Sequence, residues 1–395
     1  VYGLCLGYED VNDHDDIRRD RLLALVVGKN DVEGKHRRRE SDIGIALAGK
    51  STLNRLEQVP FVGEMNRYHK IGYSAEKVDR LMTDIFLESF KKSPKRIFLD
   101  LDTTDAILHG EQEGRFFHGY YDNYCYTPLY IFCGEHLLLS RLQSANVDAA
   151  AHAVVEVKRI VAQIRETWSE VEIVLRGDSG FCRDELMSWC EANDVRYIFG
   201  LAQNTRLLTC IKKKMRKSRR RYFGNRKSTR RYADFNYRTQ KSWSKSRRVV
   251  GKAEYLEKGA NPRFIVTNLD KDIFTTQMIY EEIYCARGDM ENRIKEQQMD
   301  LYADRVSNMQ MKSNQLRLYF SGIAYILMQA FRRLGLTGTE YAKAQCGTIR
   351  TKLMKLGALI KISIRRIVIS LASACPYANI LRQSWQNLTG PPISA

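Results

Sequence analysis

Carboxylates stand at the ends of two predicted strands. Residues 96–102 alternate between apolar and polar types, which predicts a β-strand with Asp100 and Asp102 on one face. Asp178 follows a strand predicted over 171–175 and lies in a turn bracketed by glycines. Taken alone, an aspartate at a strand end more often caps a turn. Two such aspartates on neighbouring strands would repel each other, and Mg²⁺ or Mn²⁺ between them would relieve that repulsion.

A third carboxylate, Glu291, lies on a helix predicted over 277–301. Four other side chains fall on the same face, within roughly 80° of arc: they are Tyr284, Arg287, Lys295 and Gln298. Such a face could contact a phosphate chain. By itself, however, the spacing favours an exposed helix with solvated ion pairs.

The order of the predicted elements indicates how these residues are positioned. Residues 1–92 form helices, predicted over 15–27, 51–57 and 74–90. The core elements that follow are strands 96–102, 115–121 and 126–133, helix 147–166, strand 171–175, helix 184–191 and strand 196–201. This order is that of a ribonuclease H-like α/β fold with a mixed sheet flanked by helices. In that fold the strands that carry Asp102 and Asp178 are neighbours.

The positive charge of the chain is concentrated in one segment. The net charge is +18, and residues 206–252 contain 19 basic residues and one acidic residue, Asp234. The rest of the chain is balanced. A segment of this charge density is expected to bind a polyanion, although a solvated loop is the alternative. Aromatic residues are interspersed with the charges, which favours a folded module: they are Tyr222, Phe223, Tyr232, Phe235, Tyr237 and Trp243.

Several short motifs resemble those of the DDE transposases of bacterial insertion sequences, in the branch with a Tyr-Arg-Glu signature. The motifs are Asp102-Thr103-Thr104, Arg176-Gly177-Asp178-Ser179-Gly180-Phe181, and Tyr284-x-x-Arg287-x-x-x-Glu291, with Leu6-Gly7-Tyr8-Glu9-Asp10, Ser51-Thr52-Leu53-x-Arg55-Leu56-Glu57 and His109-Gly110-x-Gln112-Glu113 in support. The resemblance covers nearly the whole chain. It implies a ribonuclease H-like core with a β-rich insertion before the glutamate.

The resemblance also implies the site residues and their ligands. Asp102, Asp178 and Glu291 would be the catalytic, metal-binding triad, holding two Mg²⁺ ions for which Mn²⁺ can substitute. Alternation alone leaves Asp100 and Asp102 open as the first member, and the Asp-x-Thr pattern of the family favours Asp102. The expected DNA-binding residues on the helix that carries Glu291 are Tyr284, Arg287 and Lys295. The charge of the basic segment adds Arg219, Arg220, Arg230 and Arg231 as expected DNA contacts.

One position departs from the family pattern. The signature usually continues with lysine seven residues after the glutamate, where this chain has Gln298. The nearest lysine, Lys295, comes four residues after Glu291 and lies on the same predicted face.

Five segments are expected along the chain. They are a helical region that binds DNA ends (1–92), the first part of the catalytic core (93–204), a basic β-rich insertion (205–275), the second part of the core with the glutamate-bearing helix (276–335) and a C-terminal helical region (336–395). Because the chain starts with Val1 and not with methionine, we expect further residues before it.

The expected function is metal-dependent cleavage at transposon ends and strand transfer into target DNA. The partners would be double-stranded terminal inverted repeats, target DNA and a second copy of the chain. The alternatives are an inactive remnant that binds DNA and a ribonuclease H-type nuclease that does not join strands. Nine widely spaced cysteines fit reduced thiols in a cytoplasm, and no apolar stretch is long enough for a membrane helix. The resemblance implies a bacterial, nucleoid-associated protein.

Overall fold

The side chains of the first core strand alternate between its two faces, and each face packs in a different hydrophobic cluster. In the computed structural model, β1 (Arg96–Thr103) buries Ile97, Leu99 and Leu101 in one hydrophobic cluster, whereas Phe98 packs against a second cluster on the opposite face. Asp100 and Asp102 follow Phe98 by two and four residues, so they share its face. The structure describes residues 1–65, 67, 71–148, 150–363 and 366–390.

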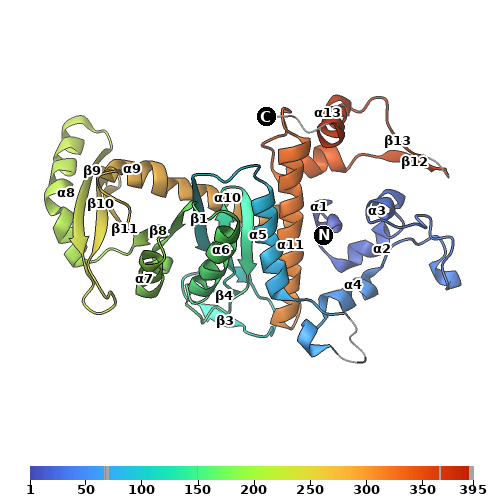
Figure 1. Ribbon diagram of the computed structural model, residues 1–395, viewed down its shortest axis with the longest axis horizontal. Helices are drawn as coiled ribbons and strands as arrows, with labels where there is room; N and C mark the ends of the chain where they lie inside the picture. The colour runs from blue at the N-terminus through green and yellow to red at the C-terminus, as the bar shows by residue number, and fades with distance from the viewer. Residues whose placement is uncertain (66, 68–70, 149, 364–365, 391–395) are drawn as a thin grey trace. The chain divides into compact units, whose positions relative to one another are not determined.

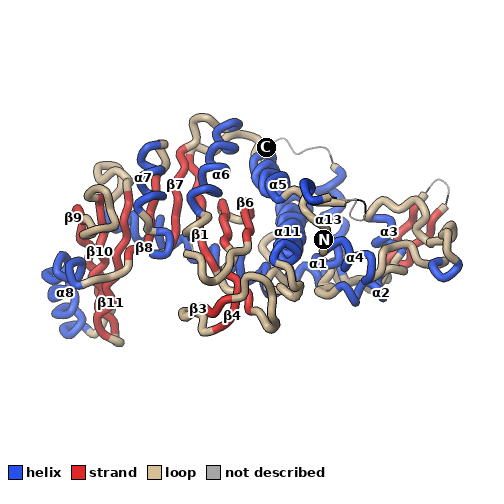
Figure 2. Tube along the Cα trace, turned by 90° about the horizontal axis from the view of Figure 1, so that it is seen from below, coloured by secondary structure: helices blue, strands red, loops and turns tan. Residues whose placement is uncertain are grey.

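The described chain forms two compact units. One unit comprises Val1–Val78, Gly110–Glu113 and Lys295–Ala395, and the other comprises Asp79–His109 and Gly114–Ile294. The second unit contains an eight-stranded sheet with the order β6-β5-β1-β7-β8-β11-β10-β9 in the described part of the chain (Figure 2). The first five strands in that order are β6 (His136–Arg141), β5 (Leu129–Cys133), β1, β7 (Glu172–Gly177) and β8 (Arg196–Leu201).

The strand directions define the fold of this sheet. β1 is antiparallel to β5 and parallel to β7, β5 is antiparallel to β6, and β7 is parallel to β8. This is the ribonuclease H-like arrangement, so the predicted fold class is confirmed. Because β1 and β7 are parallel neighbours, their carboxyl ends meet at one edge of the sheet.

Helices cover both faces of the sheet. The first face packs against α5 (Ala75–Glu88), α6 (Ala153–Thr167) and α7 (Asp184–Ala192), which supply Phe86, Val157 and Leu186 to the larger cluster. The opposite face packs against Ile279, Tyr280 and Ile283. These residues belong to an irregular helix, here called the motif helix, which consists of α9 (Thr276–Met278), the π-helical turn η5 (Ile279–Tyr284), the 3₁₀ turn η6 (Cys285–Arg287) and α10 (Gly288–Leu301).

The basic segment continues the core sheet. β11 (Gly259–Thr267) pairs antiparallel with β8, and it is followed in the sheet by β10 (Arg247–Leu256) and β9 (Thr229–Tyr237). Before these strands comes α8 (Thr205–Asn225), which lies along β9 and β10 (Figure 1). The helix approaches closely at Gly251, where an added Cβ would lie 2.6 Å from a methyl carbon of Ile211.

The other compact unit is mainly helical. Its larger helices are α4 (Lys50–Glu57), α11 (Met311–Ala330) and α13 (Ala378–Thr389). Shorter helices are α1 (Tyr2–Cys5), η1 (Val11–Asp13), α2 (His14–Ile17), α3 (Arg21–Val26), η2 (Glu40–Asp42), η3 (Val62–Glu64), η7 (Phe331–Gly335), α12 (Cys346–Ile349) and η8 (Arg350–Met354). None of the helices in the described residues has the length and apolarity needed to cross a membrane.

Some element predictions were wrong. The stretch 115–121 does not join the core sheet. It contributes β3 (Phe116–His118) to a separate small sheet with β2 (Ala106–Ile107) and β4 (Asn123–Tyr126). The third core strand is instead β6, which was not predicted because its apolar residues run on without alternation. The helix expected over 15–27 is interrupted between α2 and α3, where the side chain of Asp20 caps a new helix by accepting from Leu23 N.

Two further segments also differ from expectation. The basic insertion begins with the 21-residue helix α8 and becomes β-rich only from Thr229. The C-terminal region, predicted to be helical, also contains a hairpin of β12 (Ala358–Ile362) and β13 (Ile367–Leu371). A short 3₁₀ turn, η4 (Ser179–Phe181), follows β7.

Candidate active site

Asp102 and Asp178 lie at the carboxyl ends of adjacent parallel strands. Each comes one residue after the paired residues Leu101 and Gly177. Both side chains are half-buried, and both accept a local backbone hydrogen bond: Asp102 from Thr103 N at 3.0 Å and Asp178 from Gly180 N at 2.8 Å. The second bond caps η4 and holds the Asp178 carboxylate at the end of its strand.

The electrostatic environment of Asp102 links it to two other groups. Burial raises the pKa of its carboxyl to about 6, the positive charge of Arg287 opposes that rise, and the negative charge of Asp178 adds to it. The charge of Asp178 thus acts on Asp102 across the ends of the two strands. A positive charge placed between them would stabilise both carboxylates.

Arg287 supplies positive charge to this cluster. Its Nη1 donates to Asp102 Oδ2 at 2.9 Å, and its Nη2 lies 3.5 Å from Glu291 Oε1 on the next turn of the motif helix. Burial lowers the pKa of the Arg287 guanidinium, but Asp102, Tyr284, Asp178 and Glu291 together raise it above its usual value. Thus Arg287 contacts Asp102 and Glu291 directly, while Glu291 itself remains 54% exposed.

Whether these carboxylates suit a divalent ion can be judged from their donor atoms. Asp102, Asp178 and Glu291 offer only hard oxygen donors, which fit Mg²⁺ or Mn²⁺. In the described residues, however, no group of three or more His, Cys, Asp or Glu side chains is close enough to hold a metal. Arg287 instead engages one oxygen of Asp102 and one of Glu291. The donor chemistry fits a divalent ion, and Arg287 joins two of the three carboxylates.

Asp100 has a different environment from Asp102. It is 4% exposed, and Arg176 on β7 binds both of its oxygens, from Nε at 2.6 Å and from Nη2 at 2.8 Å. Arg176 stands in a motif noted in the sequence, but no role was predicted for it. The sequence could have indicated this ion pair, because Asp100 lies two residues before Asp102 and Arg176 lies two residues before Asp178.

A pocket of about 330 Å³ adjoins Asp178. Its lining includes Ser179, Gln203, Arg263, Tyr280 and Tyr284. The rings of Tyr280 and Tyr284 lie 5.7 Å apart between centroids. Sequence patterns predicted Tyr284 but not Arg263, which is distant in the chain and becomes a neighbour only because β11 pairs with β8.

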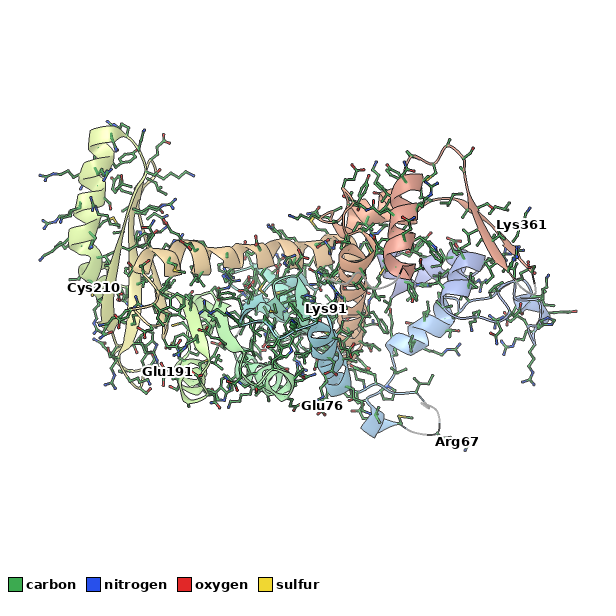
Figure 3. The ribbon with its side chains drawn as sticks, turned by 45° about the horizontal axis from the view of Figure 1, so that its top comes forward. Arg67, Glu76, Lys91, Glu191, Cys210 and Lys361 are labelled. Atoms are coloured by element: carbon green, nitrogen blue, oxygen red, sulfur yellow. The ribbon has the colours of Figure 1, made fainter. Side chains whose placement is uncertain are left out.

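The predicted basic residues occupy different surfaces. Arg219 and Arg220 are exposed on α8, and the guanidinium of Arg219 lies 5.7 Å from the centre of the Phe223 ring. Side chains tipped with nitrogen project from α8 around the labelled Cys210 (Figure 3). Arg230 on β9 is paired with Glu254 at 2.7 Å and with Glu281 at 3.2 Å, and Arg231 is partly buried.

Lys295 and Gln298 belong to the last turns of α10. Lys295 is exposed and Gln298 is partly buried, and both fall within the other compact unit. They share the helix that carries Glu291.

The fold and the site define a class of protein. The order and directions of β6, β5, β1, β7 and β8 are those of a ribonuclease H-like fold, and Asp102 and Asp178 directly follow the paired residues of β1 and β7. The chain belongs to the family Transposase DDE domain group 1, whose sequence profile matches residues 1–391. Its function is therefore DNA transposition. Proteins of this kind are polynucleotidyl transferases or endonucleases, and they generally use divalent metal ions.

Solved structures of two transposases are weakly similar to this chain. The cryo-EM structure of the piggyBac transposase synaptic complex with hairpin DNA is 11% identical, with a TM-score of 0.34 over 82% of this chain and 74% of that chain. The Mos1 transposase paired-end complex with left transposon end is 10% identical, with a TM-score of 0.20 over 45% of this chain and 57% of that chain. No curated protein is significantly similar in sequence. The profile match shows the family, and the order and directions of the strands show the fold.

Proposed function

We propose that Asp102, Asp178 and Glu291 form the active site that cleaves transposon ends and joins them to target DNA. The observation that carries this proposal is the contact of Arg287 with both Asp102 and Glu291, beside a strand that ends in Asp178. Two carboxylates thus contact one guanidinium, and the charge of a third, Asp178, also acts on it. Such a concentration of negative charge is unfavourable unless cations neutralise it.

The proposed ligands of the triad are two Mg²⁺ ions, for which Mn²⁺ can substitute. When bound, such ions activate a water or a 3′-hydroxyl and stabilise the leaving oxygen. Arg287 neutralises Asp102 and Glu291 in the structure described here. We expect its guanidinium to turn to a DNA phosphate when the carboxylates are occupied, because arginine binds phosphate and carboxylate with the same fork of donors.

We assign the other DNA contacts to two surfaces. Tyr284, Arg287 and Lys295 would hold phosphates or a displaced base beside the scissile bond, and the pocket next to Asp178 offers space for one. The exposed cations of α8, Arg219 and Arg220 among them, would contact the DNA backbone. Arg230 and Arg231 are expected to contribute less, because Arg230 is already paired with two glutamates.

The remaining assignments are part of the same proposal. The DNA partners are terminal inverted repeats and target DNA, and two copies of the chain act together because strand transfer joins two ends. Residues 1–92 would recognise the ends, and the five segments predicted from the sequence remain the proposed division. Action on chromosomal DNA would place the protein in the cytoplasm with the nucleoid.

Two substitutions test the active site. Asp178→Ala and Glu291→Gln should each reduce cleavage and joining to background while the affinity for end DNA stays within about twofold, because a metal ligand is lost and the phosphate contacts remain. The matched control is Glu282→Gln, which changes an exposed glutamate on the same helix. Substantial cleavage by either triad variant in Mg²⁺ would refute the assignment.

A metal switch separates Asp102 from Asp100. Asp102→Cys should be inactive in Mg²⁺ and regain activity in Mn²⁺, because a thiolate is a poor ligand for Mg²⁺ and a better one for Mn²⁺. Asp100→Cys should show no such rescue.

Joining of pre-cleaved ends by the unmodified protein distinguishes a transposase from a nuclease that only cuts. DNA binding without cleavage in either metal would identify an inactive remnant.

A further inference from the structure

A buried ion pair lies on the same face of the sheet as the proposed active site, two residues earlier on each of the two strands. Asp100 and Arg176 are paired across β1 and β7, and they are 4% and 7% exposed. Since side chains alternate along a strand, Asp102 and Asp178 follow directly above them, two residues further on each strand. The contacts that hold Asp100 and Arg176 in place therefore also determine the positions of Asp102 and Asp178.

Arg176 also reaches a third element. Its Nη1 donates to the backbone oxygen of Ile283 at 2.7 Å, while Nε and Nη2 hold Asp100. The guanidinium carbon lies 4.7 Å from the centre of the Phe98 ring, which packs beneath it. One side chain thus connects β1, β7 and the motif helix. All of these contacts are made in the interior, where few alternative partners are available.

The place where Arg176 holds the motif helix is irregular. Ile283 belongs to the π-helical turn, which is followed by a 3₁₀ turn and then by α10. A π turn and a 3₁₀ turn rotate the residues that follow by amounts different from those of a regular helix. The residue after Ile283 is Tyr284, so the fixed carbonyl immediately precedes the first member of the Tyr-Arg-Glu signature. The rotation of Arg287 and Glu291 about the helix axis depends on this turn.

We propose that the Asp100–Arg176 pair positions the motif helix, so that Arg287 and Glu291 face Asp102 and Asp178. This inference rests on the proposed active site. Asp100 and Arg176 do not touch DNA or metal. Asp100 orients the guanidinium of Arg176, and Arg176 fixes the carbonyl of Ile283. They are positioning residues, and they act through the three carboxylates that they align.

The alternative is that the pair serves stability alone. That alternative is weak on general grounds, because buried ion pairs can often be replaced by apolar side chains of similar size without loss of stability. The same property provides the test. Asp100→Leu combined with Arg176→Met removes both charges, leaves no buried charge without a partner and removes the bond to Ile283.

The double variant should fold and retain its affinity for end DNA. Its rate of cleavage at saturating DNA should fall about 100-fold, the effect expected when catalytic groups are displaced by about 1 Å. Hydrogen exchange of the backbone amides in 279–287 should become about tenfold faster or more, because a hydrogen bond from a charged donor is lost. Amides of β1 and β7 should keep their protection. Wild-type exchange in 279–287 together with wild-type cleavage would overturn the proposal.

A second variant keeps the test decisive if the double variant fails to fold. In Arg176→Lys, a single ammonium group cannot bind both Asp100 oxygens and the Ile283 oxygen with the geometry of a guanidinium. We expect the same faster exchange in 279–287 and a lower cleavage rate, at little change in melting temperature. Wild-type values for both would count against the proposal.

The control is another buried arginine in the same unit. Arg247 is 4% exposed and binds Asp184 and Glu191 on α7, away from the motif helix. Arg247→Met should lower the melting temperature but leave exchange in 279–287 unchanged. Faster exchange in 279–287 in the Arg247→Met variant would mean that general destabilisation, and not the loss of the Arg176 contact, accelerates exchange. If the unmodified protein neither cleaves nor joins DNA, the active-site proposal fails, whereas the exchange measurement still decides the positioning role.

Discussion

At the scale of single residues, the site depends on the absence of a side chain at Gly200. A Cβ added to Gly200 on β8 would lie 2.8 Å from the hydroxyl of Tyr284 and 2.9 Å from the backbone nitrogen of Ser179. The tyrosine can therefore pack against the strand only because this position is glycine. Gly200 and Tyr284 together form one wall of the pocket beside Asp178.

Replacing Gly200 with alanine should disturb both neighbours at once. We expect Gly200→Ala to lower the free energy of unfolding by about 1–3 kcal/mol, as overpacking usually does. We also expect a larger loss in cleavage than in stability, because Tyr284 and the turn after Asp178 must shift. Chemical denaturation and a cleavage assay on the same preparation measure the two effects. Gly224→Ala is the control, since nothing lies within 4 Å of an added Cβ there.

The relief of this clash can be measured separately. Tyr284→Phe removes the hydroxyl that would collide with the new Cβ, so it should recover part of the stability lost in Gly200→Ala. Independent, additive effects of the two substitutions would show that the close approach of Gly200 and Tyr284 has no energetic role.

At the scale of elements, Arg247 fastens the inserted strands to the core. Its guanidinium on β10 donates to Asp184 Oδ1 at 2.6 Å and to Glu191 Oε1 at 2.8 Å, both on α7. Burial tends to raise the pKa values of these two carboxyls, but hydrogen bonds, including those from Arg247, hold both below their ordinary values. The ionised carboxylates therefore contribute stability above the ordinary pKa values of about 4, and this contribution is lost as the pH falls below them.

This network predicts a pH-dependent effect of Arg247→Met. At pH 7 the variant should lose about 3 kcal/mol of unfolding free energy, because two partly buried carboxylates lose their partner. As the pH falls toward 3, the unfolded chain takes up protons at these two carboxyls more readily than the folded wild type does, so the difference between the variant and the wild type should shrink. Urea unfolding at the two pH values tests this prediction. An equal difference at both values would mean that packing, and not charge pairing, accounts for the loss.

The sequence predicted elements better than it predicted their partners. β8 was predicted with the bounds that the structure has, because a short apolar run between polar turns is unambiguous. The alternation in 115–121 correctly indicated extended chain, yet a local pattern does not specify which sheet a strand joins. The spacing of Arg287 and Glu291 predicted their contact. Neither the π-helical turn before them nor the bond from Arg176 to Ile283 follows from periodicity, and the bond joins residues 107 positions apart.

At the scale of the whole molecule, some basic side chains form ion pairs with carboxylates and others do not. The segment 206–252 carries the excess charge of the chain, but Arg230, Arg247 and Arg248 in it are bound to carboxylates. Arg219 and Arg220 on α8 are exposed, and neither forms an ion pair with another described residue. The net charge of a segment therefore overstates the charge available to DNA. The helix α8 offers more basic charge to DNA than β9 and β10 do.

This difference can be read from the salt dependence of DNA binding. Neutralising Arg219 and Arg220 to glutamine should make the slope of log K against log salt shallower by about 1.8, at about 0.9 per phosphate contact. The matched change, Arg230→Gln with Arg231→Gln, should alter the slope less. Filter binding or fluorescence anisotropy over a range of salt concentrations measures both. Equal changes in the two variants would contradict the assignment of the contact surface to α8.

The pairing of β11 with β8 has a consequence for any shortened form of the protein. In the described sheet, β8 would be the last strand if residues 205–275 were deleted, and its row of backbone donors and acceptors would face solvent. Such an open edge invites strand pairing between molecules. The present last strand, β9, carries the charged residues Arg230, Arg231 and Asp234, and charged residues on an edge strand hinder that kind of pairing. We therefore expect a protein that lacks residues 205–275 to aggregate unless the exposed edge of β8 is covered in another way.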